Sequence, residues 1–261
     1  MRYTERVKFH HMISISVLIS FVGCSGRGDF QSGILTSLTL PENSRQILFV
    51  TVSSWNDVQG TLRLFGRTES GWKAECDDIP VVLGRNGLGW GRGLHALNLA
   101  GPQKMEGDGR APAGVFDLGT SFGYDLQRPD GSSYPYRQAA EHDYFIDDVD
   151  SPTYNQWQSL DDSADTDPYY YWTSFERMRR DDDLYELGIV VKHNMDPVEK
   201  GRGSAIFFHV WRGPDQPTAG CTAMSKEHLL TLLRWLDPSK YPLLVQVPEN
   251  VLKKGLLRID H

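Results

Sequence analysis

The 261-residue sequence is poor in cysteine, with only Cys24, Cys76 and Cys221. It has no Cys-x-x-Cys pair and no two histidines at helical spacing, so the common zinc-binding patterns are absent. It also lacks the Asp-x-Asp-x-Asp-Gly loop typical of a helical calcium site. We therefore expect neither a metal ion nor a cofactor.

Positive charge and long apolar runs are also scarce. Lys and Arg number 27 against 34 Asp and Glu, which gives a formal net charge of −7. Nucleic-acid binding needs a basic surface, so this class of partner is excluded. The apolar stretch between Met12 and Val22 is too short to cross a bilayer as a helix. No internal repeat is present.

The N-terminus has the features of a secretion signal. Three basic residues precede the apolar stretch: Arg2, Arg6 and Lys8. We therefore predict a signal peptide over residues 1–23. The sequence Phe21-Val22-Gly23-Cys24 resembles a bacterial lipobox, so we expect lipidation of Cys24 and anchoring on the periplasmic side of the cell envelope, at the outer membrane in a Gram-negative cell. The alternative is an ordinary cleaved signal peptide.

The remainder alternates short apolar runs with Gly, Asn and Asp turns, which is typical of a mainly β domain. We expect a tether over 24–45, one domain over 46–248 and a C-terminal tail over 249–261. The predicted strands are 47–52, 62–64, 79–83, 188–192, 205–211 and 243–247, with a hairpin turn at Ser70-Gly71. One clear helix is predicted between the cap residue Ser225 and Leu236, and Pro238 ends it.

Residues 124–183 differ from this pattern. The segment is rich in Asp, Tyr and Pro and is weakly periodic. A long irregular segment in a compact domain is commonly functional, so we predict a lid-like insertion that borders the active groove. We interpret its acidic clusters as solvated surface: Asp147-Asp148, Asp161-Asp162 and Asp181-Asp182-Asp183.

A histidine and a cysteine form the strongest chemical signal. His209 ends the apolar run 205–209, and Cys221 follows Gly220 twelve positions later. An imidazole can take the proton of a thiol, and the resulting thiolate attacks carbonyl carbons. The simpler interpretation is a small buried cysteine and a hydrogen-bonded histidine. If Cys221 is the nucleophile it must stay reduced, so we interpret Cys76 as a buried structural thiol.

Three segments carry a family resemblance: Gly203-Ser204-Ala205-Ile206-Phe207-Phe208-His209, Thr218-Ala219-Gly220-Cys221, and the stretch from Glu106 to Phe116. Together they resemble the L,D-transpeptidase (YkuD-like) catalytic domain, here in a lipoprotein-type member. The resemblance covers about 46–248. It implies a mainly β fold, a β-sandwich with a few helices and a long inserted loop.

The resemblance also implies an activity in cell-wall biogenesis and cell shape. Family members form a thioester between their cysteine and a peptidoglycan stem peptide, then pass the acyl group to an amine or to water. By this resemblance Cys221 is the nucleophile and His209 the general base. The carbonyl of Val210 would orient the imidazole. The amides of Gly220 and Cys221 would line the oxyanion hole.

The sequence also departs from the family. Ala219 stands where most members carry histidine, Ala223 stands where many carry arginine or asparagine, and the interval from His to Cys is shorter than usual. The polar groups that hold the stem peptide must then come from elsewhere. Candidates to bind the substrate are Arg110, Tyr154, Lys192 and His193.

Three alternatives remain beside transpeptidation. The same site could hydrolyse the same bonds as an amidase or carboxypeptidase. The fold could serve as a non-catalytic wall-binding lipoprotein. A thiol–zinc hydrolase using His193, His209 and Cys221 is the third, although the spacing matches no zinc pattern. No motif specifies the acyl acceptor or the oligomeric state.

Overall fold

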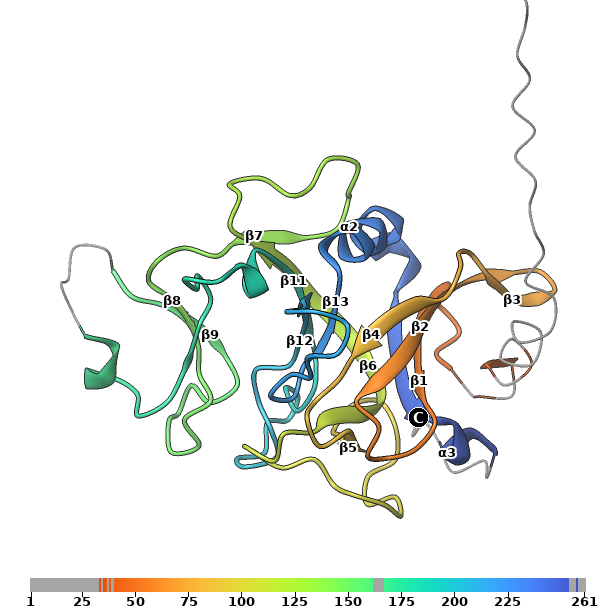
Figure 1. Ribbon diagram of the computed structural model, residues 1–261, viewed down its shortest axis with the longest axis horizontal. Helices are drawn as coiled ribbons and strands as arrows, with labels where there is room; N and C mark the ends of the chain where they lie inside the picture. Colours follow the sequence, from red (N-terminus) through yellow and green to blue (C-terminus); the bar gives the residue numbers. More distant parts are fainter. Residues whose placement is uncertain are drawn as a thin grey trace, which may run out of the picture.

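The computed structural model describes residues 40–161 and 167–253, together with Gly33, Leu35, Thr36, Leu38 and Leu257. The predicted signal peptide, the lipidation site Cys24 and most of the tether and tail lie outside the described residues. The described chain is mainly β, as predicted (Figure 1). Its helices are few and short, and none of those described is both long and apolar enough to cross a membrane.

The main sheet closes on itself. Around the closed part the strand order is β1 (Gln46–Val52), β14 (Leu243–Pro248), β6 (Ala111–Gly123), β11 (Leu187–Val191), β12 (Phe207–Val210), β13 (Thr222–Met224), β4 (Ile79–Val82) and β2 (Gln59–Thr68). The first strand, β1, pairs with both β14 and β2, which completes the ring. The expected sandwich is therefore one continuous, barrel-like sheet.

Shorter strands extend this ring. They are β3 (Gly71–Ala74), which pairs with β2, and β5 (Leu88–Trp90) and β7 (Tyr136–Gln138), which pair with β6. The strands β1, β11 and β14 are buried along their whole length. Strands buried on both faces need continuous apolar runs, and the apolar runs of β1, β11 and β14 therefore allowed these strands to be predicted from the sequence.

The helix α2 (Lys226–Trp235) confirms the predicted helix. Its side chains Leu229, Leu232 and Leu233 are buried, and the helix packs against β12 and β11. The other described helical turns are η1 (Pro168–Tyr170), η2 (Asp183–Tyr185), η3 (Pro238–Lys240) and α3 (Glu249–Lys253).

The N-cap of α2 gives a stability prediction. Ser225 Oγ accepts a hydrogen bond from the backbone N–H of His228 at 3.2 Å. The change Ser225→Ala leaves that donor without its partner, so the free energy of unfolding should fall by about 1 kcal/mol. Urea titration measures the loss, and Ser70→Ala in an exposed turn is the control. Equal midpoints for the two variants would contradict the cap assignment.

The inserted segment 124–183 has a small sheet of its own. The strands β8 (Asp143–Phe145), β9 (Trp157–Ser159) and β10 (Glu176–Arg177) pair in the order β10-β8-β9 and lie beside the main ring (Figure 1). Phe145 packs edge-on against Phe207 of β12, with ring centroids 5.1 Å apart. The segment is therefore docked on the strand that carries His209.

The acidic clusters of this segment are not all solvated surface, which corrects the sequence interpretation. Asp148 is buried and accepts hydrogen bonds from the backbone N–H and the hydroxyl of Thr173, at 2.7 and 2.8 Å. These bonds hold the pKa of the Asp148 carboxyl below its usual range. Asp147 is half-buried and lines the cavity described next.

Candidate active site

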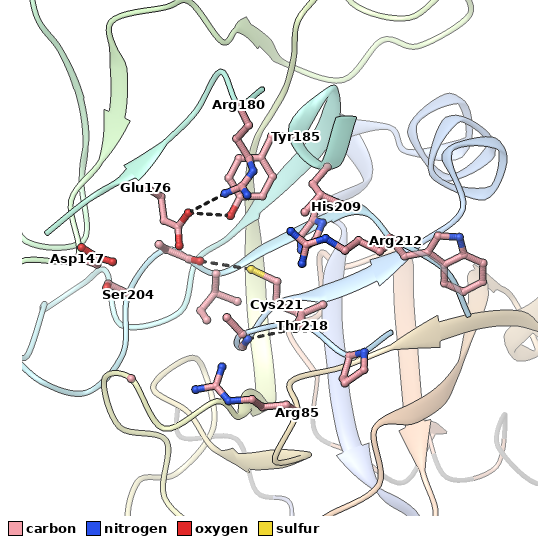
Figure 2. A pocket seen from close by; sticks show the side chains of 18 of the residues that line it. Arg85, Asp147, Glu176, Arg180, Tyr185, Ser204, His209, Arg212, Thr218 and Cys221 are labelled. Carbon is pink, nitrogen blue, oxygen red and sulfur yellow. Dashed lines mark hydrogen bonds and ion pairs between the residues drawn. The ribbon is translucent and has the colours of Figure 1, made fainter. Parts of the chain in front are cut away.

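Cys221 and His209 line one cavity of about 250 Å³ (Figure 2). Cys221 immediately precedes β13, and His209 lies on β12. These strands are parallel neighbours, with His209 opposite Ala223. The pairing brings the cysteine and the histidine to the same cavity.

His209 is held in the form that a general base requires. The ring is buried, and Nδ1 lies 2.8 Å from the carbonyl oxygen of Val210. A carbonyl only accepts, so Nδ1 carries the proton and Nε2 keeps a free lone pair. The Tyr185 ring packs edge-to-face against the imidazole at a centroid distance of 5.3 Å. The Val210 carbonyl therefore lies where the family resemblance predicted it, in contact with Nδ1.

The Cys221 thiol makes its hydrogen bonds with backbone. Sγ accepts from the N–H of Phe207 at 3.3 Å and donates to the carbonyl of Ala205 at 3.4 Å. The neighbouring Gly220 also packs closely, because a Cβ there would make a tight contact of 3.2 Å with the carbonyl oxygen of Arg110. The sulfur is therefore fixed by backbone on both sides.

Burial keeps both reacting groups neutral at rest. It raises the pKa of the Cys221 thiol to about 12 and lowers the pKa of His209 to about 4. Between these values the pair is a thiol and a neutral imidazole. The resting site therefore holds a neutral thiol rather than a thiolate. Cys221 is 7% exposed, and thiolate must form when the proton moves to His209 during the reaction.

One predicted oxyanion donor is occupied. The N–H of Gly220 donates to Thr218 Oγ1 at 3.1 Å, and the same hydroxyl donates to the carbonyl of Cys221 at 2.7 Å. The Gly220 amide is thus engaged by the Thr218 side chain in the resting site. The amide of Cys221 stays the predicted donor for an oxyanion.

Charged side chains of both signs line the cavity that contains Cys221. The carboxylates that line the cavity are Glu106, Asp147 and Glu176, and the arginines are Arg85, Arg180 and Arg212. Burial raises the pKa of Asp147 and of Glu176. Arg180 forms an ion pair with Asp182 at 2.7 Å, and Arg212 approaches the same carboxylate at 3.3 Å. Figure 2 shows Glu176 and Asp147 on the opposite side of Cys221 from Arg212.

Sequence reasoning missed these residues. Asp147, Glu176 and Arg180 belong to the inserted segment and stand in charged runs that resemble a solvated surface. The one sequence feature that could have pointed to them is the predicted lid-like insertion, which was expected to border the groove. The segment does border the cavity.

The four predicted substrate-binding residues do not line this cavity. The guanidinium of Arg110 does not line the cavity and donates to the carbonyl of Leu88 at 2.7 Å. Lys192 is exposed and lines two other cavities. Tyr154 is buried behind the wall, where its hydroxyl donates to Glu106.

His193, the fourth of these residues, has a structural role. Its Nδ1 accepts from the N–H of Arg92 at 3.1 Å, and its Nε2 contacts the carbonyl of Arg202 at 2.9 Å. Burial lowers the pKa of His193 to about 3. Both ring nitrogens are therefore occupied away from the cavity. Within the described parts of the chain, no group of three His, Cys, Asp or Glu side chains could hold a metal ion.

Cys76 is exposed, so its interpretation as a buried structural thiol is wrong. It follows the short outer strand β3 and stands in the acidic run Glu75-Cys76-Asp77-Asp78. Partial burial and the negative charges of these carboxylates raise the pKa of the thiol. A raised pKa leaves little thiolate at neutral pH, so the exposed thiol reacts slowly.

The buried imidazole predicts a pH dependence of stability. The unfolded chain binds a proton at His209 below pH 6.5, whereas the folded chain resists protonation down to about 4. The free energy of unfolding should therefore fall as the pH falls through this window. Urea midpoints between neutral pH and about pH 4 measure the slope. The change His209→Asn removes this titration and should make the slope shallower, and an unchanged slope would contradict the assignment.

The fold and the cavity define a mainly β domain that brings one cysteine and one histidine together. The model of the L,D-transpeptidase catalytic domain, YkuD, matches residues 76–247, which is more than half of the chain. The chain belongs to the L,D-transpeptidase catalytic domain family.

Other comparisons add likenesses of shape. A comparison with curated proteins finds no match. The helical cell shape determining protein Pgp2 from Campylobacter jejuni is similar at 13% identity and a TM-score of 0.39, over 84% of this chain and 54% of that one. A point mutant of that protein gives 14% identity and a TM-score of 0.37, over 84% and 53%. The chain spans about half the length of these structures.

Proposed function

We propose that the protein is a cysteine-dependent acyltransferase that acts on peptidoglycan stem peptides. The observation that carries this proposal is the Nδ1 contact of His209 with the Val210 carbonyl, beside Cys221 in one cavity. That contact leaves Nε2 as the base in a chain of the L,D-transpeptidase family.

The first half of the reaction forms a thioester. The thiol proton turns from the Ala205 carbonyl and passes to Nε2 of His209. Sγ of Cys221 then bonds to the scissile carbonyl carbon, and the carbonyl oxygen gains negative charge. When this intermediate collapses, the C–N bond breaks and the imidazolium returns its proton to the departing amine. The second half reverses these steps with an incoming amine, or with water.

The charged walls suit a peptide that has a free carboxylate. Arg85 and Arg212 line the cavity and could pair with the C-terminal carboxylate of a tetrapeptide stem. Both side chains are monovalent cations with planar, multiply donating groups. This assigns to the arginines of the cavity the binding role that the sequence gave to Arg110, Tyr154, Lys192 and His193.

A substrate in the cell wall places the protein in the cell envelope. The predicted signal peptide and Cys24 would supply a lipid anchor there. Mass spectrometry of the mature N-terminus from a native host should find acylated Cys24. A mature chain that begins after Cys24 would overturn the anchor.

Purified muropeptides test the proposed activity. The protein should convert tetrapeptide muropeptides, and mass analysis separates the outcomes. Crosslinked dimers indicate transpeptidation, whereas shortened stems indicate hydrolysis by the same thioester. If the protein binds muropeptides with no covalent product, the non-catalytic wall-binding role is the better description.

A further inference from the structure

The carbonyl that receives the Cys221 thiol belongs to a strained residue. Ala205 has φ +52°, a left-handed conformation that residues with a Cβ rarely adopt. It immediately precedes Ile206 and β12, and its carbonyl oxygen lies 3.4 Å from Sγ of Cys221. Strain of this kind persists only where neighbouring groups enforce it.

The enforcing group is the side chain of Asn155. Its Oδ1 accepts from the N–H of Ala205 at 3.2 Å. Its Nδ2 donates to the carbonyls of His193 and Asn194, at 2.9 and 2.7 Å. Asn155 is 3% exposed, so these three bonds occupy its amide in a place where water cannot substitute.

The same small region gathers several left-handed residues. Asn155 has φ +62°, Asn194 has φ +54° and Gly203 has φ +95°. Asn194 Nδ2 donates to the carbonyl of Gly203 at 3.0 Å, two residues before Ala205. The side chains of two buried asparagines therefore fix the backbone that leads into β12, and one of them comes from the inserted segment.

We infer that Asn155 is a positioning residue for the Cys221 nucleophile, because it holds the strained Ala205 peptide whose carbonyl receives the thiol. Asn155 does not contact the reacting atoms, and it acts through Ala205. The term nucleophile rests on the proposed function. The orientation of the thiol by the Ala205 carbonyl is tested without turnover.

A carbonyl acceptor stabilises the neutral thiol, so losing it lowers the thiol pKa. Other groups also act on Cys221 and must be kept unchanged in the test. The titratable side chains that face it or line its cavity are His209 on β12, Tyr185 on η2, Glu176, Arg180 and Asp147 of the inserted segment, and Arg85, Lys104, Glu106 and Arg212.

The test measures alkylation of Cys221 by iodoacetamide as a function of pH, with peptide mass spectrometry to separate it from the other cysteines. Asn155→Gly keeps the left-handed backbone and removes the amide. Alkylation of Cys221 at neutral pH should then rise by about three- to tenfold, which corresponds to a midpoint lower by up to one pH unit. The double variant Asn155→Gly with Ala205→Gly should return toward the wild-type profile, because glycine adopts φ +52° without a clamp.

Asn98→Gly is the matched control, since Asn98 is an exposed asparagine with φ +59° outside the cavity. Its profile should equal that of the wild type. If Asn155→Gly does not fold, Ala205→Val gives the same test, because a β-branched residue disfavours the left-handed conformation and should raise alkylation likewise. If none of these changes alters the pH profile of Cys221 alkylation, the inference is overturned. Failure of muropeptide turnover in the wild type would overturn the proposed function and leave this result standing.

Discussion

Replacing Cys221 with alanine should abolish product formation from tetrapeptide muropeptides. The change removes the only atom proposed to bond to the substrate, so turnover should fall by about a thousandfold or more. It also removes two backbone contacts of the sulfur, to Phe207 and Ala205. These are weak bonds, so the free energy of unfolding should fall by only about 1 kcal/mol. Quantitative mass analysis of the muropeptide products measures the first effect, and urea titration measures the second.

The control for this variant is Cys76→Ser. Cys76 is exposed and does not line the cavity, so its loss should leave turnover unchanged. Equal turnover by the wild type and Cys221→Ala would remove Cys221 from the mechanism. A wild type without turnover but with muropeptide binding would instead favour the non-catalytic wall-binding role.

Replacing His209 should slow the reaction without removing the nucleophile. His209→Ala loses the base, and a positioned general base contributes about a hundred- to ten-thousandfold to the rate. The loss of rate should be larger at neutral pH than at alkaline pH. At alkaline pH hydroxide can deprotonate the thiol, whose pKa is about 12, without help from His209. A pH profile of the thioester-forming rate measures this difference.

His228→Ala is a suitable comparison for the histidine variant. His228 lies in the first turn of α2, and it does not line the cavity. Its replacement should leave the rate and its pH profile unchanged. If His209→Ala and His228→Ala react equally fast at every pH, another group must take the proton.

The local sequence predicted the ring strands well because most of them are buried on both faces. Apolar runs such as 47–52 and 243–247 have few alternatives to a central strand. The long strand β6 is not among the predicted strands, since Pro112, Gly114 and Gly119 interrupt its apolar pattern. Closure of the ring could not be predicted, because it depends on the pairing of β1 with β14 across almost the whole domain.

The site was predictable at its centre and less so at its edges. Cys221 and His209 come from short motifs whose chemistry depends on residue type, so the sequence was sufficient to propose them, and the structure places both in one cavity. The state of the thiol was not predictable, because burial raises its pKa and that burial depends on the fold. The walls of the cavity were missed for a related reason: Glu176 and Arg180 are charged residues whose burial depends on where the inserted segment docks.

The closed sheet has a consequence for how the chain reaches its folded state. Its closure needs the last strand, since β14 lies between β1 and β6. Pairing between strands so distant in sequence is slow to form. A chain that ends before Leu243 would leave the edges of β1 and β6 unpaired, and such edges are templates for association with other chains. Incomplete or still-emerging chains should therefore aggregate far more readily than the finished protein.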